Sequence, residues 1–158
     1  MIPIVERFKS LFKTKNIRVD GKWYGFYRYS HSHSEHIRSK KIEFVAHILL
    51  IKSMDFIGTI KESEEGISEL SNISGQIRGN KIEFSKKYEN LYEIDELGNQ
   101  TTYAGPQYVF YSGIYDNTKD SFFGEWRIRT IYEYENGSKV TNDTTGYWQM
   151  ARKSTDVV

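Results

Sequence analysis

A short pattern recurs five times along this chain: a large apolar residue, then a glycine and a second large apolar residue at alternate positions. The five copies are Trp23-x-Gly25-x-Tyr27, Phe56-x-Gly58-x-Ile60, Ile73-x-Gly75-x-Ile77, Tyr111-x-Gly113-x-Tyr115 and Phe122-x-Gly124-x-Trp126. Residues two apart on a β-strand point to the same face, so each glycine lies among large side chains. Because glycine weakens a strand, its recurrence there predicts bends and close backbone approaches. The pattern therefore predicts a small sheet that curls into a closed barrel.

The composition is consistent with one all-β domain. A chain of 158 residues is most simply a single domain that buries a sizeable core. Its twelve tyrosines, nine phenylalanines and three tryptophans favour pleated strands over a helical bundle. A net charge of +1 gives no bulk electrostatic reason to expect a nucleic-acid partner. The absence of cysteine excludes disulfides, thiolate chemistry and cysteine zinc sites.

The distribution of apolar residues bears on where the protein works. The N-terminus lacks the apolar stretch and small-residue cleavage site of a signal peptide. No run approaches the ~20 apolar residues that would cross a bilayer, so we expect no transmembrane segment. The longest apolar stretch, 44–51, is interrupted by His47 and predicts a buried strand. Together with the absence of cysteine, these features favour a soluble, cytoplasmic protein.

The spacing of apolar residues divides the chain into three parts. Residues 1–16 follow helical spacing with a charged opposite side, which predicts a short amphipathic N-terminal helix. Residues 17–152 change to a period of two, and residues 153–158 should form a frayed tail. Eight strands joined by short connections predict an antiparallel up-and-down barrel. The predicted strands are 21–30, 42–52, 54–61, 68–78, 80–88, 102–115, 121–134 and 144–152.

Several motifs, taken together and in this order, resemble the lipocalins and related calycin barrels. The segment Gly21-Lys22-Trp23-Tyr24-Gly25 is similar to the Gly-x-Trp signature of their first strand. The motifs that follow are Ile82-x-Phe84-x-Lys86-x-Tyr88, Tyr111-x-Gly113, Phe123-Gly124-x-Trp126 and Gly146-x-Trp148-x-Met150. The resemblance covers residues 20–152. It implies an eight-stranded antiparallel barrel with a short N-terminal helix near one end.

The resemblance also implies structural roles for two basic residues. In lipocalins the first-strand tryptophan packs under a basic side chain that follows the last strand. We therefore expect a cation–π contact between Trp23 and Arg152. Lys86 is a competing partner, because it shares parity with Phe84 and Tyr88. Its stem would then lie along the interior, with the ammonium reaching water or a carboxylate.

Six aromatic residues are candidates to line a ligand cavity. They are Trp23, Tyr27, Tyr29, Tyr111, Tyr115 and Trp126. Where they share a strand they also share parity, so they would present amphipathic rings with polar tips to the barrel interior. Such a lining suits a planar, partly polar small molecule. The alternative is that the rings simply fill the interior, as side chains do in small eight-stranded barrels.

Histidines offer the other candidate chemistry. His31, His33 and His36 lie in one polar segment with Glu35, a set that could bind zinc, nickel or copper. The same segment could instead be a solvated loop or a pH-sensitive lid. His47 could meet a ligand in the cavity, or be a hydrogen-bonded or outward-facing histidine. No cofactor is identified by the sequence.

The leading hypothesis is a non-catalytic module that holds a small, partly apolar ligand among aromatic side chains. The alternative is a protein-interaction module that works through the N-terminal helix or the barrel surface, around a solid core. A third hypothesis, an enzyme acting inside the barrel, requires a titratable group buried beside the cavity. The sequence contains no Gly-x-Ser-x-Gly elbow, phosphate-binding glycine loop or His-Glu-x-x-His motif.

Overall fold

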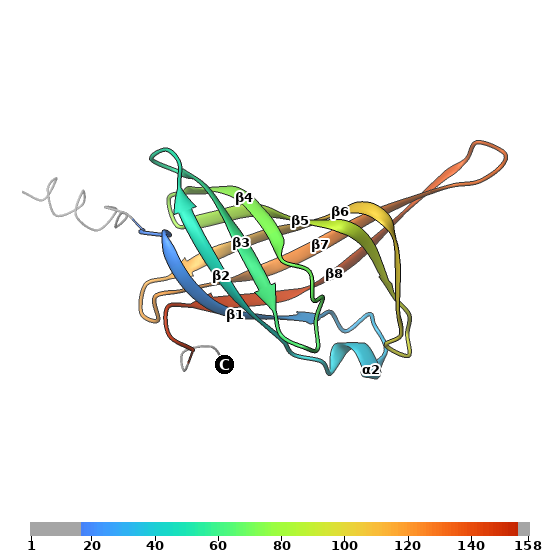
Figure 1. Ribbon diagram of the computed structural model, residues 1–158, viewed down its shortest axis with the longest axis horizontal. Coiled ribbons are helices and arrows are strands. Elements are labelled where there is room, and N and C mark those ends of the chain that lie inside the picture. Colours follow the sequence, from blue (N-terminus) through green and yellow to red (C-terminus); the bar gives the residue numbers. More distant parts are fainter. Residues whose placement is uncertain (1–16, 155–158) are drawn as a thin grey trace, which may run out of the picture.

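The protein is a closed antiparallel barrel of eight strands (Figure 1). A computed structural model describes residues 17–154. Each strand pairs with the next along the chain, and β8 returns to pair with β1 from Ala151–Tyr24 to Gly146–Tyr29. The strands are β1 (Gly21–Tyr29), β2 (Ile42–Leu50), β3 (Asp55–Glu62), β4 (Ser71–Arg78), β5 (Lys81–Ile94), β6 (Gln100–Asp116), β7 (Ser121–Glu133) and β8 (Lys139–Ala151). The expected order of eight antiparallel strands is therefore confirmed.

Several element bounds differ from the expected ones. Pairing of β5 with β6 continues to Ile94–Gln100, and pairing of β7 with β8 continues to Glu133–Lys139. These outer parts are two-stranded ribbons. The predicted strands 80–88 and 144–152 left out the outer parts of β5 and β8, whereas the predicted strand 121–134 already included that of β7. No residue is buried in β5 beyond Tyr88 or in β8 before Gly146, so these parts lack core-facing alternation. A short helix, α2 (Glu35–Arg38), also lies within the segment expected to be a loop. The predicted N-terminal helix, 1–16, and the end of the predicted tail lie outside the described residues.

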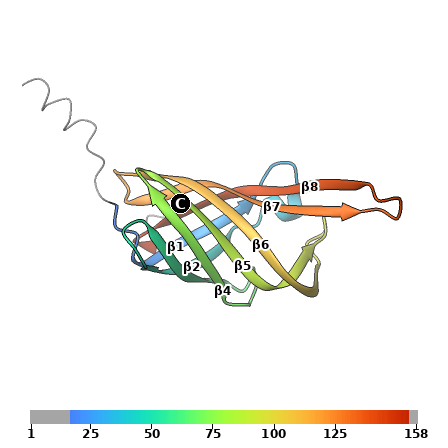
Figure 2. The same cartoon turned by 90° about the horizontal axis from the view of Figure 1, so that it is seen from above.

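The up-and-down path gathers the connections at two ends of the barrel. We call one the Trp23 end, which comprises residues 17–22, 50–55, 78–81, 116–121 and 152–154. We call the other the mouth, which comprises the connections 30–41, 63–70, 95–99 and 134–138. In Figure 1 the Trp23 end is on the left and the mouth on the right. The β7–β8 ribbon projects past the rest of the mouth in Figure 2.

The Trp23 end is packed and sealed. The ring of Trp23 meets Phe122 edge to face at 5.2 Å between centroids, and its indole N–H donates to the Val19 carbonyl at 2.7 Å. The guanidinium of Arg152 lies 3.9 Å from the centre of the Trp23 ring and donates to the Asp20 carbonyl at 2.8 Å. The cation–π contact expected from the sequence resemblance is therefore present. Trp23 is wholly buried beneath it.

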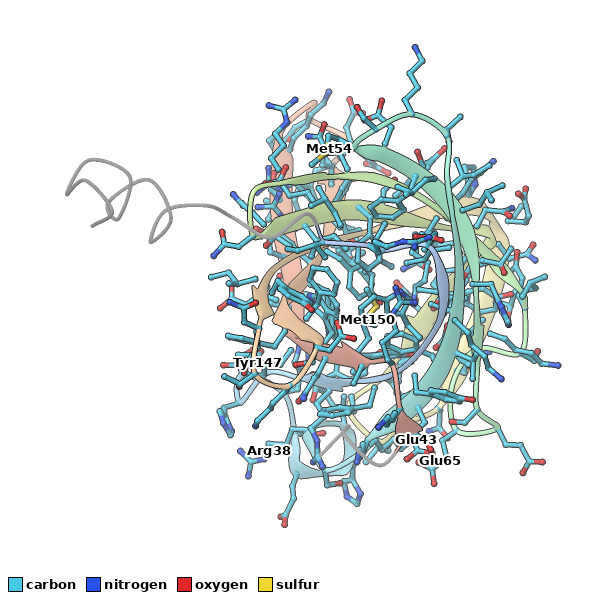
Figure 3. The ribbon with its side chains drawn as sticks, turned by 90° about the vertical axis from the view of Figure 1, so that its left-hand side faces the viewer. Arg38, Glu43, Met54, Glu65, Tyr147 and Met150 are labelled. Carbon is cyan, nitrogen blue, oxygen red and sulfur yellow. The ribbon has the colours of Figure 1, made fainter. Side chains whose placement is uncertain are left out.

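The recurring glycines lie where strands approach each other closely. A Cβ at Gly124 would sit 1.8 Å from the Ser112 carbonyl oxygen, and one at Gly58 would sit 2.1 Å from the His47 carbonyl oxygen. Both contacts are with backbone, which cannot move aside without disturbing the ladder. The close approaches predicted from the pattern are confirmed at these positions. Figure 3 looks into the barrel from the Trp23 end and shows Met150 inside the ring of strands.

Candidate functional site

A cavity of about 440 Å³ opens at the mouth. Strands β1, β5, β6, β7 and β8 contribute to its wall, together with residues of the β1–β2 connection that includes α2. Four of the six predicted ligand-binding residues line it. They are Tyr27, Tyr29, Tyr111 and Trp126. The volume lies in the range of small-molecule sites in proteins.

The floor of the cavity is a buried ion pair. Lys86 donates to Glu62 at 3.4 Å between Nζ and Oε2, and neither side chain is more than 2% exposed. The hydroxyls of Tyr27 and Tyr88 donate to the same carboxylate. The backbone N–H of Ile67 donates to it at 3.3 Å. Each carboxylate oxygen thus has two donors, as a buried charge requires.

Three tyrosine rings surround the Lys86 ammonium. Its nitrogen lies 4.9, 4.8 and 5.3 Å from the ring centres of Tyr27, Tyr88 and Tyr111. Burial favours the neutral amine, but Tyr111 and Glu62 outweigh burial and raise the pKa of Lys86 above its ordinary value. Burial, reinforced by the charge of Glu62, holds the pKa of Tyr27 and of Tyr88 well above 10.0. The floor therefore combines a cation, an anion and neutral hydroxyl donors, with no net charge.

Strand alternation explains how the ion pair comes to be inside. Lys86 follows the inward-facing Phe84 on β5, so its position agrees with the expectation from parity, and the carboxylate that it reaches is that of Glu62. Glu62 lies just past the predicted strand 54–61, but it is the last residue of β3 and faces inward two positions after Ile60. The parity with Ile60 was the available signal. Sequence reasoning also missed Tyr88 as a partner of this floor.

Aromatic rings form the wall above the floor. Tyr29 meets Trp126 at 5.0 Å and 90°, and meets His33 at 5.2 Å and 78°. The Trp126 indole N–H donates to the Arg28 carbonyl at 3.1 Å, which fixes the ring. Burial raises the pKa of Tyr29 strongly, so its hydroxyl stays protonated. Among residues 17–154 that hydroxyl has no hydrogen-bond partner, and it borders the cavity as a polar group available to a ligand.

The rim joins two connections and one ribbon. In the β1–β2 connection, the backbone N–H of Ser34 donates to the Glu96 carboxylate at 2.9 Å. The Ser34 hydroxyl donates to the Glu96 backbone carbonyl at 2.6 Å. These bonds hold the α2 segment against the tip of the β5–β6 ribbon. A register shift between Tyr88 and Asn90 interrupts the ladder where that ribbon leaves the barrel wall. The β7–β8 ribbon completes the rim with Ile128, Thr130, Tyr132, Asn142 and Thr144.

The other two predicted ligand residues, Trp23 and Tyr115, belong to the Trp23 end. Tyr115 packs on Phe122 at 5.1 Å between centroids, and its hydroxyl donates to Asp120. Burial and this bond raise the pKa of Tyr115 to about 12. Parity identifies the face of a strand but not the depth, and each step of two residues moves about 7 Å along it. The six residues therefore divide into four at the mouth and two at the opposite end.

The histidines do not assemble a metal site in the part of the chain that the structure describes, where no three ligating side chains converge. His31 and His36 are exposed, whereas His33 is partly buried. His33 instead packs on a tyrosine and lies 4.0 Å from Glu96. His47 is exposed on the outer face of β2, so it does not meet the cavity.

Across residues 17–154, no helix has the length and apolar character needed to cross a membrane.

Comparisons with known proteins leave the site to be interpreted from its own geometry. No protein-family model matches the sequence, and a search of curated proteins gives no match. The calycin resemblance remains an expectation that rests on the ordered sequence motifs.

Proposed function

We propose that this protein is a calycin-like barrel that binds a small, planar, partly apolar molecule at its mouth without catalysing a reaction. The observation that carries the proposal is the aromatic-walled cavity above the Glu62–Lys86 floor. Binding sites for small molecules are typically concave and mostly apolar, with a few well-placed polar groups. The mouth is concave and has aromatic rings in its wall, with polar groups at its floor and rim, whereas the Trp23 end is filled.

The wall indicates the chemistry of the ligand. The perpendicular rings of Tyr29 and Trp126 offer one face and one edge to a flat, unsaturated molecule. The Tyr29 hydroxyl, with Asn142 and Thr144 on the rim, can bond polar groups at the edge of such a molecule. Because the floor carries no net charge, it places no demand for a charged ligand.

The hydrogen bonds already made to the Glu62 carboxylate support ligand binding rather than catalysis. A general base needs a lone pair directed at the substrate, whereas both oxygens of Glu62 already accept two hydrogen bonds each. Moving a proton from Tyr27 or Tyr88 would place a second negative charge beside that carboxylate. The raised pKa values of both tyrosines express this cost.

A cavity-filling variant tests the proposal. Thr130 lines the cavity, whereas Thr141 is exposed on the partner strand of the same ribbon and does not line it. We expect the neutral planar dye N-phenyl-1-naphthylamine to bind the wild-type protein with enhanced fluorescence. Thr130→Trp should weaken binding at least ~10-fold because the indole occupies the cavity, and Thr141→Trp should bind as the wild type does.

Native mass spectrometry of the purified protein provides a second measurement, which needs no chosen probe. A co-purified small molecule that is present in the wild type and in Thr141→Trp, and absent from Thr130→Trp, would support the proposal. Dye binding that Thr130→Trp leaves unchanged, with no co-purified molecule, would overturn it.

A further inference from the structure

Five large aliphatic side chains are exposed within nine residues around the β2–β3 connection. They are Leu49, Leu50, Ile51, Met54 and Ile57, with exposures between 37% and 64%. We call this set the aliphatic tip. Leu49 and Ile57 are cross-strand partners, so the exposed apolar surface continues from the outer face of the hairpin onto the turn. Exposed apolar clusters of this kind mark interaction surfaces.

The backbone holds the aliphatic tip in place. The Ile51 N–H donates to the Asp55 carbonyl at 2.9 Å, which closes the turn. The Ile77 N–H donates to the Met54 carbonyl at 2.9 Å, which ties the turn to β4. Figure 1 shows the β2–β3 hairpin extending above the left-hand rim, and Figure 3 places Met54 at the edge of the barrel seen end on. The exposure therefore belongs to an ordered, projecting hairpin.

The Trp23 end, to which the tip belongs, is predominantly basic. This end contains twice as many Lys and Arg residues as Asp residues: Arg18, Lys22, Lys52, Arg78, Lys81, Lys119, Arg152 and Lys153 against Asp20, Asp55, Asp116 and Asp120. The connections of the mouth have the opposite balance, with Glu35, Glu64, Glu65, Glu69, Asp95, Glu96 and Glu135 against Arg38, Lys40 and Lys41. An anionic surface would attract one end of the barrel and repel the other.

The preceding segment of the chain has the same character. Ile17, the first residue that the structure describes, packs against the core at the Trp23 end, so residues 1–16 are joined to the chain at this end. That segment carries four basic residues and one acidic residue among large apolar ones. Apolar side chains combined with Lys and Arg are typical of protein segments that lie at a lipid interface.

From these observations we infer that the Trp23 end docks on an anionic lipid surface, with the aliphatic tip entering the interface. The charge balance favours anionic lipid headgroups, and the cluster of exposed aliphatic side chains suits the acyl boundary beneath them. Docking in this orientation directs the mouth and its cavity away from the bilayer. The cavity then stays open to solutes in the water phase.

Vesicle co-sedimentation of the full chain tests the inference. Vesicles of phosphatidylcholine with one quarter phosphatidylglycerol should bind the protein, and vesicles of phosphatidylcholine alone should bind it at least ~10-fold less. The double variant Ile51→Asp/Met54→Asp should lose at least ~10-fold in affinity for the anionic vesicles. The matched control is Leu97→Asp, which alters the most exposed large apolar residue of the mouth, at 72%, and should bind normally.

A charge variant keeps the inference testable if the tip variant does not fold. Lys52→Glu/Lys119→Glu changes only exposed side chains and should also weaken binding to the anionic vesicles. Circular dichroism and thermal unfolding establish that each variant is folded. Absence of binding to anionic vesicles, or binding of the folded tip and charge variants as tight as that of the wild type, would overturn the inference. A dimer in light scattering that the tip variant dissociates would assign the tip to a second copy and overturn it as well.

Discussion

The same eight strands build two ends that differ in packing, polarity and charge. At the Trp23 end a wholly buried tryptophan lies under Arg152, and apolar side chains fill the interior. At the mouth the interior holds a cavity above the Glu62–Lys86 pair, and tyrosines line this cavity together with aliphatic and polar side chains. The difference shows that a closed barrel can have a tightly packed interior in one half only. The other half is then free to remain incompletely filled.

Tryptophan truncation should separate the two ends most strongly. Trp23→Ala removes a fully packed ring and should lower the free energy of unfolding by about 3–5 kcal/mol. Trp126→Ala should cost about half as much, because Trp126 already borders the cavity and the space it leaves joins that cavity. Urea unfolding followed by circular dichroism measures both values. Equal losses would contradict a difference in packing between the ends.

Breaking the Glu62–Lys86 ion pair tests how much the floor of the cavity contributes to the stability of the protein. Glu62→Leu leaves the Lys86 ammonium buried without its carboxylate and should destabilise the protein by about 3 kcal/mol. The double variant Glu62→Leu/Lys86→Met removes both charges and should recover most of that loss. Urea unfolding of the single and double variants gives the comparison. If the double variant is no more stable than the single, the uncompensated charge is not the cause.

Replacing Arg152, which covers Trp23, should lower the stability of the fold without changing dye binding at the mouth. Arg152→Met loses the contact with Trp23 and the bonds to backbone carbonyls, and should cost about 1–2 kcal/mol. Arg152→Lys should recover less than half, because an ammonium cannot reproduce the planar guanidinium. Dye binding at the mouth should stay within twofold of wild type. A large loss of dye binding would show that the two ends are coupled.

The smallest expected effect is the loss of stability at alkaline pH that buried tyrosines of the mouth cause. A buried tyrosine with a raised pKa keeps its proton in the folded state while the unfolded chain releases it above pH 10. Its contribution to stability is therefore complete below pH 10 and is lost as the pH rises towards the folded-state pKa. At about pH 10.5 each such tyrosine should cost about 0.8 kcal/mol. Tyr88→Phe should reduce the alkaline loss by that amount.

The sequence predicted the ring of strands because alternation and glycine spacing report directly on strand faces. Trp23 and Tyr29 show the limit of that signal, since they share a face and yet lie at opposite ends of the barrel. Glu62 shows a second limit. The predicted strand 54–61 ended just before it, and only its bonds to residues far along the chain make its burial favourable. Such bonds depend on closure of the barrel, which a local pattern cannot express.

The β7–β8 ribbon has a consequence for association between copies of the chain. Closure of the barrel pairs every strand along its wall, but in the described chain β6 stops pairing with β7 beyond Arg127, and β1 stops pairing with β8 beyond Gly146. The ribbon past these points presents open backbone donors and acceptors, the kind of template on which cross-β aggregates grow. The Arg129–Asp143 ion pair puts charged groups on this stretch. Such charges act as gatekeepers against fibril growth from this ribbon, which projects past the rest of the mouth.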